Sequence, residues 1–333
     1  MLHRILALAA ASFLSSTTLA QPTDAPATPP VQSKPTTKSR PTIYNEKADA
    51  KQQIAAALAS AKANNRRVLI QWGGNWCSWC ILLNKTMKAD KALAKELNYE
   101  YDVVHIDAGQ PDDKNLDLAT TYGADLKKNG FPFLTILDAA GKPLANHETS
   151  SLELKDDKGE SVLGDKAGHD PKKLLDLLKK HEATPVLAQD LLDKALADAK
   201  AANKSVFIHF GAPWCSWCHR LENWMARPEV AALLAKDFVS VKIDQDRNTG
   251  GLNLLTKMRT NNDGGIPWFA FLDASGTTIA TSTVSKANLG FPAEPGEIEQ
   301  FGVLLRKAAK NLTSAEIDAL TTLLKSDKPA TTH

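Results

Sequence analysis

Long apolar runs, net charge and cysteine are scarce in this sequence, and the first two scarcities each exclude a class of protein. The 333 residues contain no apolar run of 18, so no segment has the length and hydrophobicity of a membrane-spanning helix. Net charge is also small: 40 basic and 38 acidic residues give +2, which offers no reason to expect binding to nucleic acid or to an acidic membrane surface. Cysteine occurs only four times. With 43% hydrophobic and 23% charged residues, the composition is otherwise that of a soluble globular protein.

The first twenty residues have the layout of a secretory signal peptide. A mildly basic start precedes an apolar stretch over 5–14, and Thr-Leu-Ala at 18–20 fits a cleavage site. Residue 21 is Gln and not Cys, so a lipid-anchored lipoprotein is not indicated. Residues 21–42 contain six Pro and five Thr, a composition that predicts a disordered linker. We therefore expect an exported protein, periplasmic or secreted, in a compartment that permits disulfides.

The rest of the chain repeats itself once. Residues 71–80 read QWGGNWCSWC and align with HFGAPWCSWC at 209–218, a constant offset of 215 − 77 = 138 residues. Further on, GFPFL at 130–134 matches GIPWF at 265–269, at an offset of 135. Two copies at this spacing predict two domains, whereas the repeats of a solenoid are about 20–50 residues long.

Each copy is expected to alternate helices with strands. Such an order predicts an α/β fold in which helices cover both faces of a mixed β-sheet. We place the first domain at 43–183 and the second at 184–327, with Thr313-Ser-Ala-Glu316 as the capping box of a C-terminal helix. The expected helices are 50–63, 77–96, 113–122 and 171–181 in the first copy and 187–202, 215–235, 250–259 and 296–310 in the second; the expected strands are 67–72, 101–107 and 132–138, then 205–210, 238–244 and 267–273, with a hairpin to a final strand in each copy.

All four cysteines lie in the two Cys-Ser-Trp-Cys motifs, each at the junction of a strand and a helix. A thiol in the first turn of a helix faces free N–H groups and the positive end of the helix dipole, which stabilise a thiolate. We therefore expect Cys77 and Cys215 to be the nucleophiles that attack a partner disulfide. Cys80 and Cys218, one turn later, are expected to resolve the mixed disulfide.

The chain resembles the thioredoxin superfamily over about 45–182 and again over 186–311. In each copy the shared order is a strand, Trp-Cys-x-x-Cys, a helix, a strand, a helix and then x-Pro before a β-hairpin. The resemblance implies two thioredoxin-like domains that exchange thiols and disulfides with protein substrates, without a cofactor or metal. An upstream redox donor or acceptor would be a further partner. It also implies that Pro132 and Pro267 form cis-Pro loops beside the Cys pairs. Trp76 and Trp214 would then form part of the surface around each site.

The motifs depart from cytosolic thioredoxins at a position that normally holds a buried Asp, six residues before the first Cys. Gln71 and His209 stand there instead. A buried carboxylate normally accepts a proton from the resolving Cys; Gln71 cannot titrate, whereas His209 can. We therefore expect the two sites to differ. His219 is expected beside the second site, where its charge would stabilise the Cys215 thiolate.

Other interpretations stay open at this stage. The Cys pairs could be plain structural disulfides, although such short loops contribute little entropy. The four sulfurs could bind zinc if the two domains faced each other. Cys215 to His219 also matches the Cys-x-x-Cys-His of haem attachment. One or both domains could instead be a binding module or chaperone with little redox turnover, with Trp79 and Trp217 either packed down or forming a platform for partners. Whether the pairs reduce, oxidise or isomerise substrates depends on their reduction potentials, which the motif does not predict.

Overall fold

The computed structural model describes residues 42–110, 112–259 and 264–326, so the predicted signal peptide and nearly all of the predicted linker lie outside the described residues. In the first copy, strands β1 to β4 form one four-stranded sheet in the order β2-β1-β3-β4. β1 pairs parallel with β2 and antiparallel with β3. The elements of this copy are α1 Ala50–Asn64, β1 Arg67–Gly73, α2 Ser78–Ala89, α3 Lys91–Glu100, β2 Tyr101–Asp107, α4 Leu116–Thr121, α5 Leu126–Asn129, β3 Phe133–Leu137, β4 Pro143–Glu148, the 3₁₀ turns η1 Ser150–Leu152 and η2 Gly164–Lys166, and α6 Pro171–Lys179.

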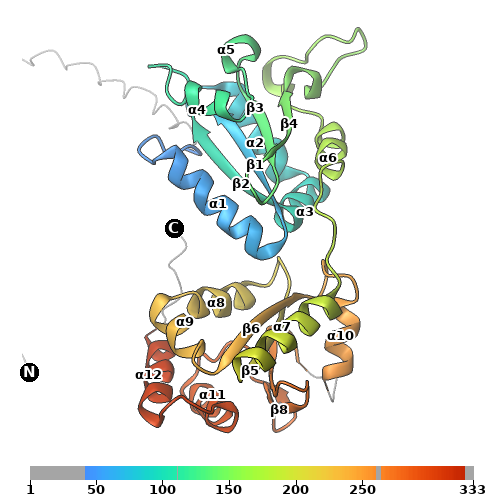
Figure 1. Cartoon of the computed structure of the whole chain (residues 1–333). Helices are drawn as coiled ribbons and strands as arrows, with labels where there is room; N and C mark the ends of the chain where they lie inside the picture. Colours follow the sequence, from blue (N-terminus) through green and yellow to red (C-terminus); the bar gives the residue numbers. More distant parts are fainter. Residues whose placement is uncertain (1–41, 111, 260–263, 327–333) are drawn as a thin grey trace, which may run out of the picture. The chain divides into compact units, whose positions relative to one another are not determined.

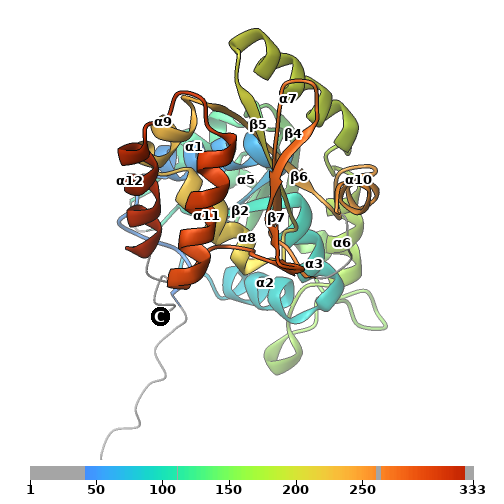
Figure 2. The ribbon, with the colours of Figure 1, turned by 90° about the horizontal axis from the view of Figure 1, so that it is seen from below.

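The second copy repeats this plan with the sheet order β6-β5-β7-β8, again with one parallel pair and antiparallel pairs beside it. The mixed α/β class that the sequence predicts is confirmed. In Figures 1 and 2 the last two helices, α11 and α12, lie side by side. The elements are α7 Ala188–Ala202, β5 Ser205–Gly211, α8 Ser216–Met225, α9 Pro228–Leu234, β6 Phe238–Asp244, α10 Gly251–Met258, β7 Trp268–Leu272, β8 Thr278–Thr281, β9 Thr283–Val284, β10 Ala287–Asn288, α11 Pro295–Ala308 and α12 Ser314–Lys325.

The prediction of a single long helix after each Cys motif is wrong, because the chain forms two helices there. Asp90 ends α2 and begins α3, where its carboxylate accepts the Leu93 amide at 2.9 Å. In the second copy Pro228 begins α9, and a proline has no N–H with which to continue the preceding helix. The predicted capping box of the C-terminal helix is confirmed, with Thr313 and Glu316 each bonding the other's backbone.

The central strand of each sheet is buried on both faces, and this burial positions the residues beneath the Cys motif. Alternate side chains of β1 point to opposite faces. Val68, Ile70 and Trp72 belong to the apolar cluster beside α1, whereas Leu69 belongs to the cluster beside α2, α3 and α6. Gln71 therefore lies on the α2 side. In β5, His209 lies on the α8 side by the same alternation.

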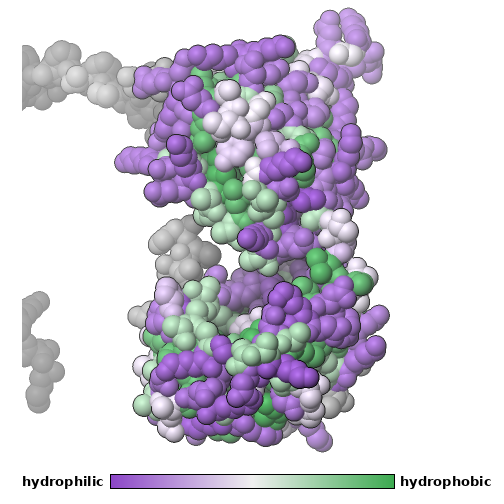
Figure 3. Space-filling view, viewed as in Figure 1, coloured by the Kyte–Doolittle hydropathy of each residue, from purple (hydrophilic) through white to green (hydrophobic). Residues whose placement is uncertain are grey.

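The largest side chains of the core include three tryptophans, Trp72, Trp224 and Trp268, which are buried. On the face shown in Figure 3, hydrophilic residues predominate and hydrophobic ones form interrupted patches. Among the described residues no helix is long and apolar enough to cross a membrane.

Candidate functional site

Each Cys pair forms a disulfide at the start of a helix, as the sequence predicts. Cys77 is the N-cap of α2 and Cys215 the N-cap of α8. The amide N of Cys80 lies 3.1 Å from Cys77 Sγ, and the amide N of Cys218 lies 3.1 Å from Cys215 Sγ. In both pairs the Cα atoms are 5.2 Å apart. Each first cysteine is therefore placed where helix N–H groups favour a thiolate.

The two predicted proline loops lie against the disulfides. The Phe131–Pro132 and Ile266–Pro267 peptide bonds are cis. In the second site Cys215 Sγ is 3.5 Å from the Ile266 carbonyl oxygen. In the first site the Phe131 ring meets the Trp76 ring edge-on, with centroids 5.3 Å apart.

The rims of the two sites differ in exposure. Trp214 is 57% exposed and Trp217 50% exposed, whereas Trp76 and Trp79 are half-buried. Trp79 packs edge-on against the buried ring of His169, at 5.6 Å between centroids. For the Trp inside each Cys pair, packing against the domain and exposure on the surface were both open. Trp79 packs down, whereas Trp217 stays on the surface.

Trp217 borders a small cavity beside the cis-Pro loop of the second site. Its ring stacks on Phe291, with centroids 6.1 Å apart and 25° between the planes. The cavity has a volume of about 290 Å³ and is lined by Pro267, Leu289 and Glu297 among others. This gives the second site an apolar recess next to its disulfide.

Beneath the first disulfide lies a buried polar pair. The Gln71 amide donates to the Tyr44 hydroxyl at 2.7 Å and to the Cys80 carbonyl at 3.1 Å. A Cβ on Gly73 would collide with both Cys80 Sγ and Tyr44 Oη, the latter at 2.6 Å. Burial raises the pKa of Tyr44, so its hydroxyl keeps its proton over the physiological range. The nearby side chain of His105 is half-buried, and desolvation lowers its pKa to about 4.

Beneath the second disulfide, His209 is accompanied by a carboxylate that the sequence analysis missed. Burial lowers the pKa of His209 to about 3, so its imidazole is neutral and only weakly basic at neutral pH. Glu222 Oε2 accepts from Lys242 at 2.8 Å, while the buried Oε1 makes no hydrogen bond to any described residue. A Cβ on Gly211 would stand 3.4 Å from Cys218 Sγ and 3.5 Å from Glu222 Oε1, so these atoms border the same small space. Glu222 is thus better placed than His209 to accept the Cys218 proton.

His219 lies on α8 beside Glu222. Its Nε2 is 2.8 Å from the Pro213 carbonyl oxygen, and its Nδ1 is 3.9 Å from Glu222 Oε2. The stabilisation of the Cys215 thiolate by His219 stays a prediction.

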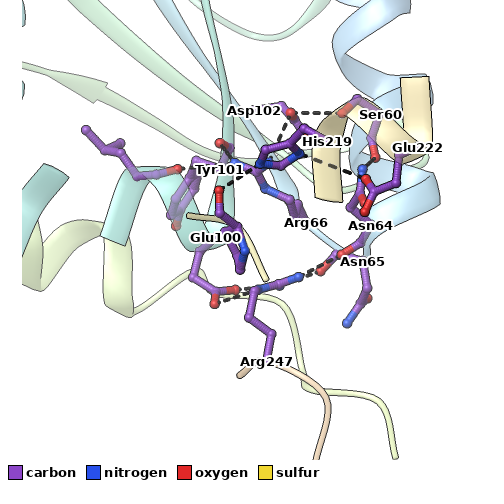
Figure 4. Close-up of polar contacts among 12 residues, drawn as sticks. Ser60, Asn64, Asn65, Arg66, Glu100, Tyr101, Asp102, His219, Glu222 and Arg247 are labelled. Atoms are coloured by element: carbon purple, nitrogen blue, oxygen red, sulfur yellow. Dashed lines mark hydrogen bonds and ion pairs between the residues drawn. The ribbon is translucent and has the colours of Figure 1, made fainter. Parts of the chain in front are cut away.

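Polar contacts join residues of the second copy to the first, and Figure 4 shows Arg247 beside Glu100 and Asn64. Lys242 Nζ donates to Asn64 Oδ1 at 2.9 Å. Close by, Arg247 holds the Glu100 carboxylate through two bonds of 2.7 and 2.9 Å and donates to the Asn64 carbonyl at 2.7 Å. Glu222 and Lys242 also line a cavity of about 680 Å³, through which solvent can approach the carboxylate.

The structure also bears on the metal interpretations. Each cysteine is bonded within its own motif, so the four sulfurs form two separate pairs instead of one tetrahedral set. Within residues 42–110, 112–259 and 264–326, no three His, Cys, Asp or Glu side chains are grouped as metal ligands.

The position of Glu222 relative to Cys218 is visible in the sequence. Glu222 follows Cys218 by four residues, which places both on one face of a helix. The corresponding residue of the first copy is Asn84, since 222 − 138 = 84, so the copies differ there as they do at Gln71 and His209. Tyr44 gave no comparable signal, because it lies far from the motif in the sequence.

Comparison with known proteins assigns both copies to related families. A family model described as "Thioredoxin-like" matches residues 49–139. A second, named Thioredox_DsbH and described as "Protein of unknown function, DUF255", matches residues 172–316. The chain therefore belongs to the thioredoxin superfamily and carries two Cys-x-x-Cys pairs.

Individual relatives match between 28% and 56% of this chain. Spermatogenesis-associated protein 20 from Homo sapiens is 30% identical over 104 residues, 28% of this chain and 13% of that protein. Protein disulfide-isomerase erp38 from Neurospora crassa is 28% identical over 190 residues, 56% of this chain and 46% of that protein. A solved structure of a disulphide isomerase from Xylella fastidiosa is 27% identical, with 43% of this chain and 98% of that chain covered and a TM-score of 0.34. The chain thus spans less than half of the curated relatives named here.

Proposed function

We propose that this protein is an exported thiol–disulfide oxidoreductase that exchanges dithiols and disulfides with protein substrates through both Cys pairs. The observation that carries the proposal is the position of each disulfide at a helix N-cap. Such a position lowers the pKa of the first thiol and makes it a good nucleophile and a good leaving group. The Cys-x-x-Cys spacing supplies the second thiol one turn away.

The chemistry at each site follows from this arrangement. A substrate thiolate attacks the sulfur of Cys77 or Cys215, forming a mixed disulfide, and Cys80 or Cys218 leaves as a thiolate. A second substrate thiolate then attacks the substrate sulfur of the mixed disulfide, which releases oxidised substrate and leaves the pair reduced. The reverse sequence reduces a substrate disulfide, and the reduction potential decides which direction prevails.

The proposal is tested with chains that retain one Cys pair, the other being changed to Ser. Each should reduce or oxidise a disulfide-containing protein with many turnovers when a thiol donor or a disulfide acceptor is supplied. In addition, Cys80→Ser and Cys218→Ser should each trap a mixed disulfide with the substrate, because the resolving thiol is missing.

The exposed Trp214 and Trp217, of which Trp217 lines the recess beside Pro267, favour a second candidate function, that of a binding module for unfolded chains. Binding of an unfolded protein that persists when all four cysteines are Ser, together with absence of turnover in both single-pair chains, would favour the binding module and contradict the proposed exchange.

A further inference from the structure

The segment that precedes the first domain is fastened to the first Cys motif by a side chain of that motif. Asn75 Oδ1 accepts the amides of Ile43 and Tyr44 at 2.9 and 3.0 Å. Its Nδ2 donates to the Tyr44 carbonyl and to the Glu46 carboxylate, both at 2.9 Å. The Lys114 ammonium donates to the Glu46 carbonyl. Four hydrogen bonds from one amide fix the backbone of Tyr44 next to the active disulfide.

These bonds direct the Tyr44 side chain beneath the disulfide. The side chain is 1% exposed and packs in one apolar cluster with Cys77 and Cys80. Its hydroxyl accepts the Gln71 amide at 2.7 Å, which leaves the phenolic proton to be donated. Because a Cβ on Gly73 would collide with both the hydroxyl and Cys80 Sγ, the hydroxyl borders the buried sulfur.

The second copy lacks this arrangement. Pro213 stands where the first copy has Asn75, and a proline side chain can neither accept nor donate these bonds. His209 replaces Gln71, and the group that borders Cys218 is the carboxylate of Glu222. Asn75 and Gln71, which hold Tyr44 in the first copy, are thus both replaced in the second copy.

We propose that Tyr44 is a further catalytic residue of the first site, whose hydroxyl donates a hydrogen bond to the Cys80 thiolate during exchange. The proposal deepens the proposed function and rests on it. When a substrate thiolate attacks Cys77 Sγ, a substrate–Cys77 bond forms, the Cys77–Cys80 bond breaks, and Cys80 leaves with the electron pair. The negative charge then lies on a sulfur with no exposed surface. A hydroxyl donor beside it stabilises that charge, and no proton is transferred.

The hydrogen-bond donor to Cys80 is the Tyr44 hydroxyl and not one of the ionisable groups around it. His105 on β2 has its ring centroid 5.5 Å from that of Tyr44, and its depressed pKa keeps it neutral. Asp107 at the end of β2 is the negative charge that acts on Tyr44, and Lys114 pairs with it at 2.8 Å. Lys88 on α2 is the positive charge that acts on His105.

The test measures the ionisation of Cys80 in the full chain carrying Cys77→Ala, Cys215→Ser and Cys218→Ser, by the ultraviolet absorbance of its thiolate against pH. A hydrogen bond to a charged group corresponds to roughly tenfold to a hundredfold in an equilibrium constant. Tyr44→Phe, which keeps the ring and removes the hydroxyl, should therefore raise the pKa of Cys80 by about one to two units. In the chain with only the first pair, it should slow attack by a small thiol on the disulfide by about tenfold.

Tyr101→Phe is the matched control, because Tyr101 is equally buried in the same domain and its hydroxyl bonds the Leu178 carbonyl instead. It should lower stability without moving the pKa of Cys80. If Tyr44→Phe does not fold, Asn75→Ala takes its place. This substitution releases the segment that contains Tyr44 and should likewise raise the pKa of Cys80.

An unchanged pKa of Cys80 in a folded Tyr44→Phe chain would overturn the proposal and leave Tyr44 as packing only. Because this measurement needs no protein substrate, it is independent of the proposed function. Turnover with an unchanged pKa removes the role of Tyr44 alone, whereas a shifted pKa without turnover removes the proposed function.

Discussion

Replacing Glu222 by Gln should make Cys218 a stronger acid and leave the first site unchanged. The two groups border one space beside Gly211, and the Glu222 oxygen that faces it has no hydrogen-bond partner among the described residues. Two unit charges about 6 Å apart repel by about 3 kcal/mol at an effective dielectric constant of about 20. That energy corresponds to about two pKa units. Since Lys242 offsets part of the Glu222 charge, we expect the pKa of Cys218 to fall by about one to two units.

The assay is again thiolate absorbance, in a full chain that carries Cys215→Ala and lacks the first pair. Glu229→Gln is the control for net charge, because Glu229 is on α9 of the same domain and pairs with Arg227 at the surface. In the chain with only the second pair intact, Glu222→Gln should also slow resolution of the mixed disulfide at neutral pH, since no carboxylate is left to take the Cys218 proton. General-base catalysis of this kind contributes about a hundredfold or more.

The reverse substitution in the first copy strengthens the comparison. Asn84→Glu places a carboxylate at the matching position under Cys80 and should raise the pKa of that thiol. If Glu222→Gln moves the pKa of Cys218 no more than Glu229→Gln does, the reasoning from the shared space is refuted.

Two further predictions concern the buried histidines and the exposed rim. Burial lowers the pKa of His105 and His169 to about 4 and that of His209 to about 3, from an ordinary value of 6.5. Their contribution to stability is thus complete above pH 6.5 and is lost as the pH falls towards these values, at about 1.4 kcal/mol per histidine and pH unit. Urea unfolding at stepped pH should show this loss, reduced in His209→Gln, which should nevertheless exchange disulfides normally at neutral pH; an unchanged acid response would contradict the assignment. Trp217→Ala should raise the KM for a protein substrate at the second site several-fold with little change in the rate for a small thiol, whereas equal loss for both would show that Trp217 supports the site structurally.

Local patterns in the sequence predict most of the fold. The strands over 101–107 and 238–244 are found at their expected bounds, because each begins at an aromatic residue, is rich in Val and Ile and ends at an Asp. The break at Asp90 was missed since an Asp inside a helical pattern reads as a surface residue until its cap bond to Leu93 is seen. The small β9–β10 hairpin was missed as well, because two-residue strands are too short to show alternation.

The candidate site, too, can be predicted from the sequence only in part. The two Cys-x-x-Cys motifs and the x-Pro segment that follows each of them are visible in the sequence, and the structure brings Cys215 to the loop of Pro267. Tyr44 is 33 residues before the nearest active cysteine, since 77 − 44 = 33, so only the folded chain shows what it contacts. The basicity of His209 also depends on burial, which no motif specifies; its role as proton acceptor stays a prediction, beside which the structure places Glu222 as a second candidate.

The most direct test of the account is the reduction potential of each Cys pair, measured against glutathione or dithiothreitol buffers in chains that retain one pair. Exchange-active pairs should equilibrate readily, with potentials within the range of about −120 to −270 mV found for thioredoxin-fold oxidoreductases. A value near −270 mV would make a pair a reductant, and one near −120 mV an oxidant. Potentials below about −300 mV for both pairs, with reduction only on unfolding, are those of structural disulfides and would contradict the claim that these are exchange centres.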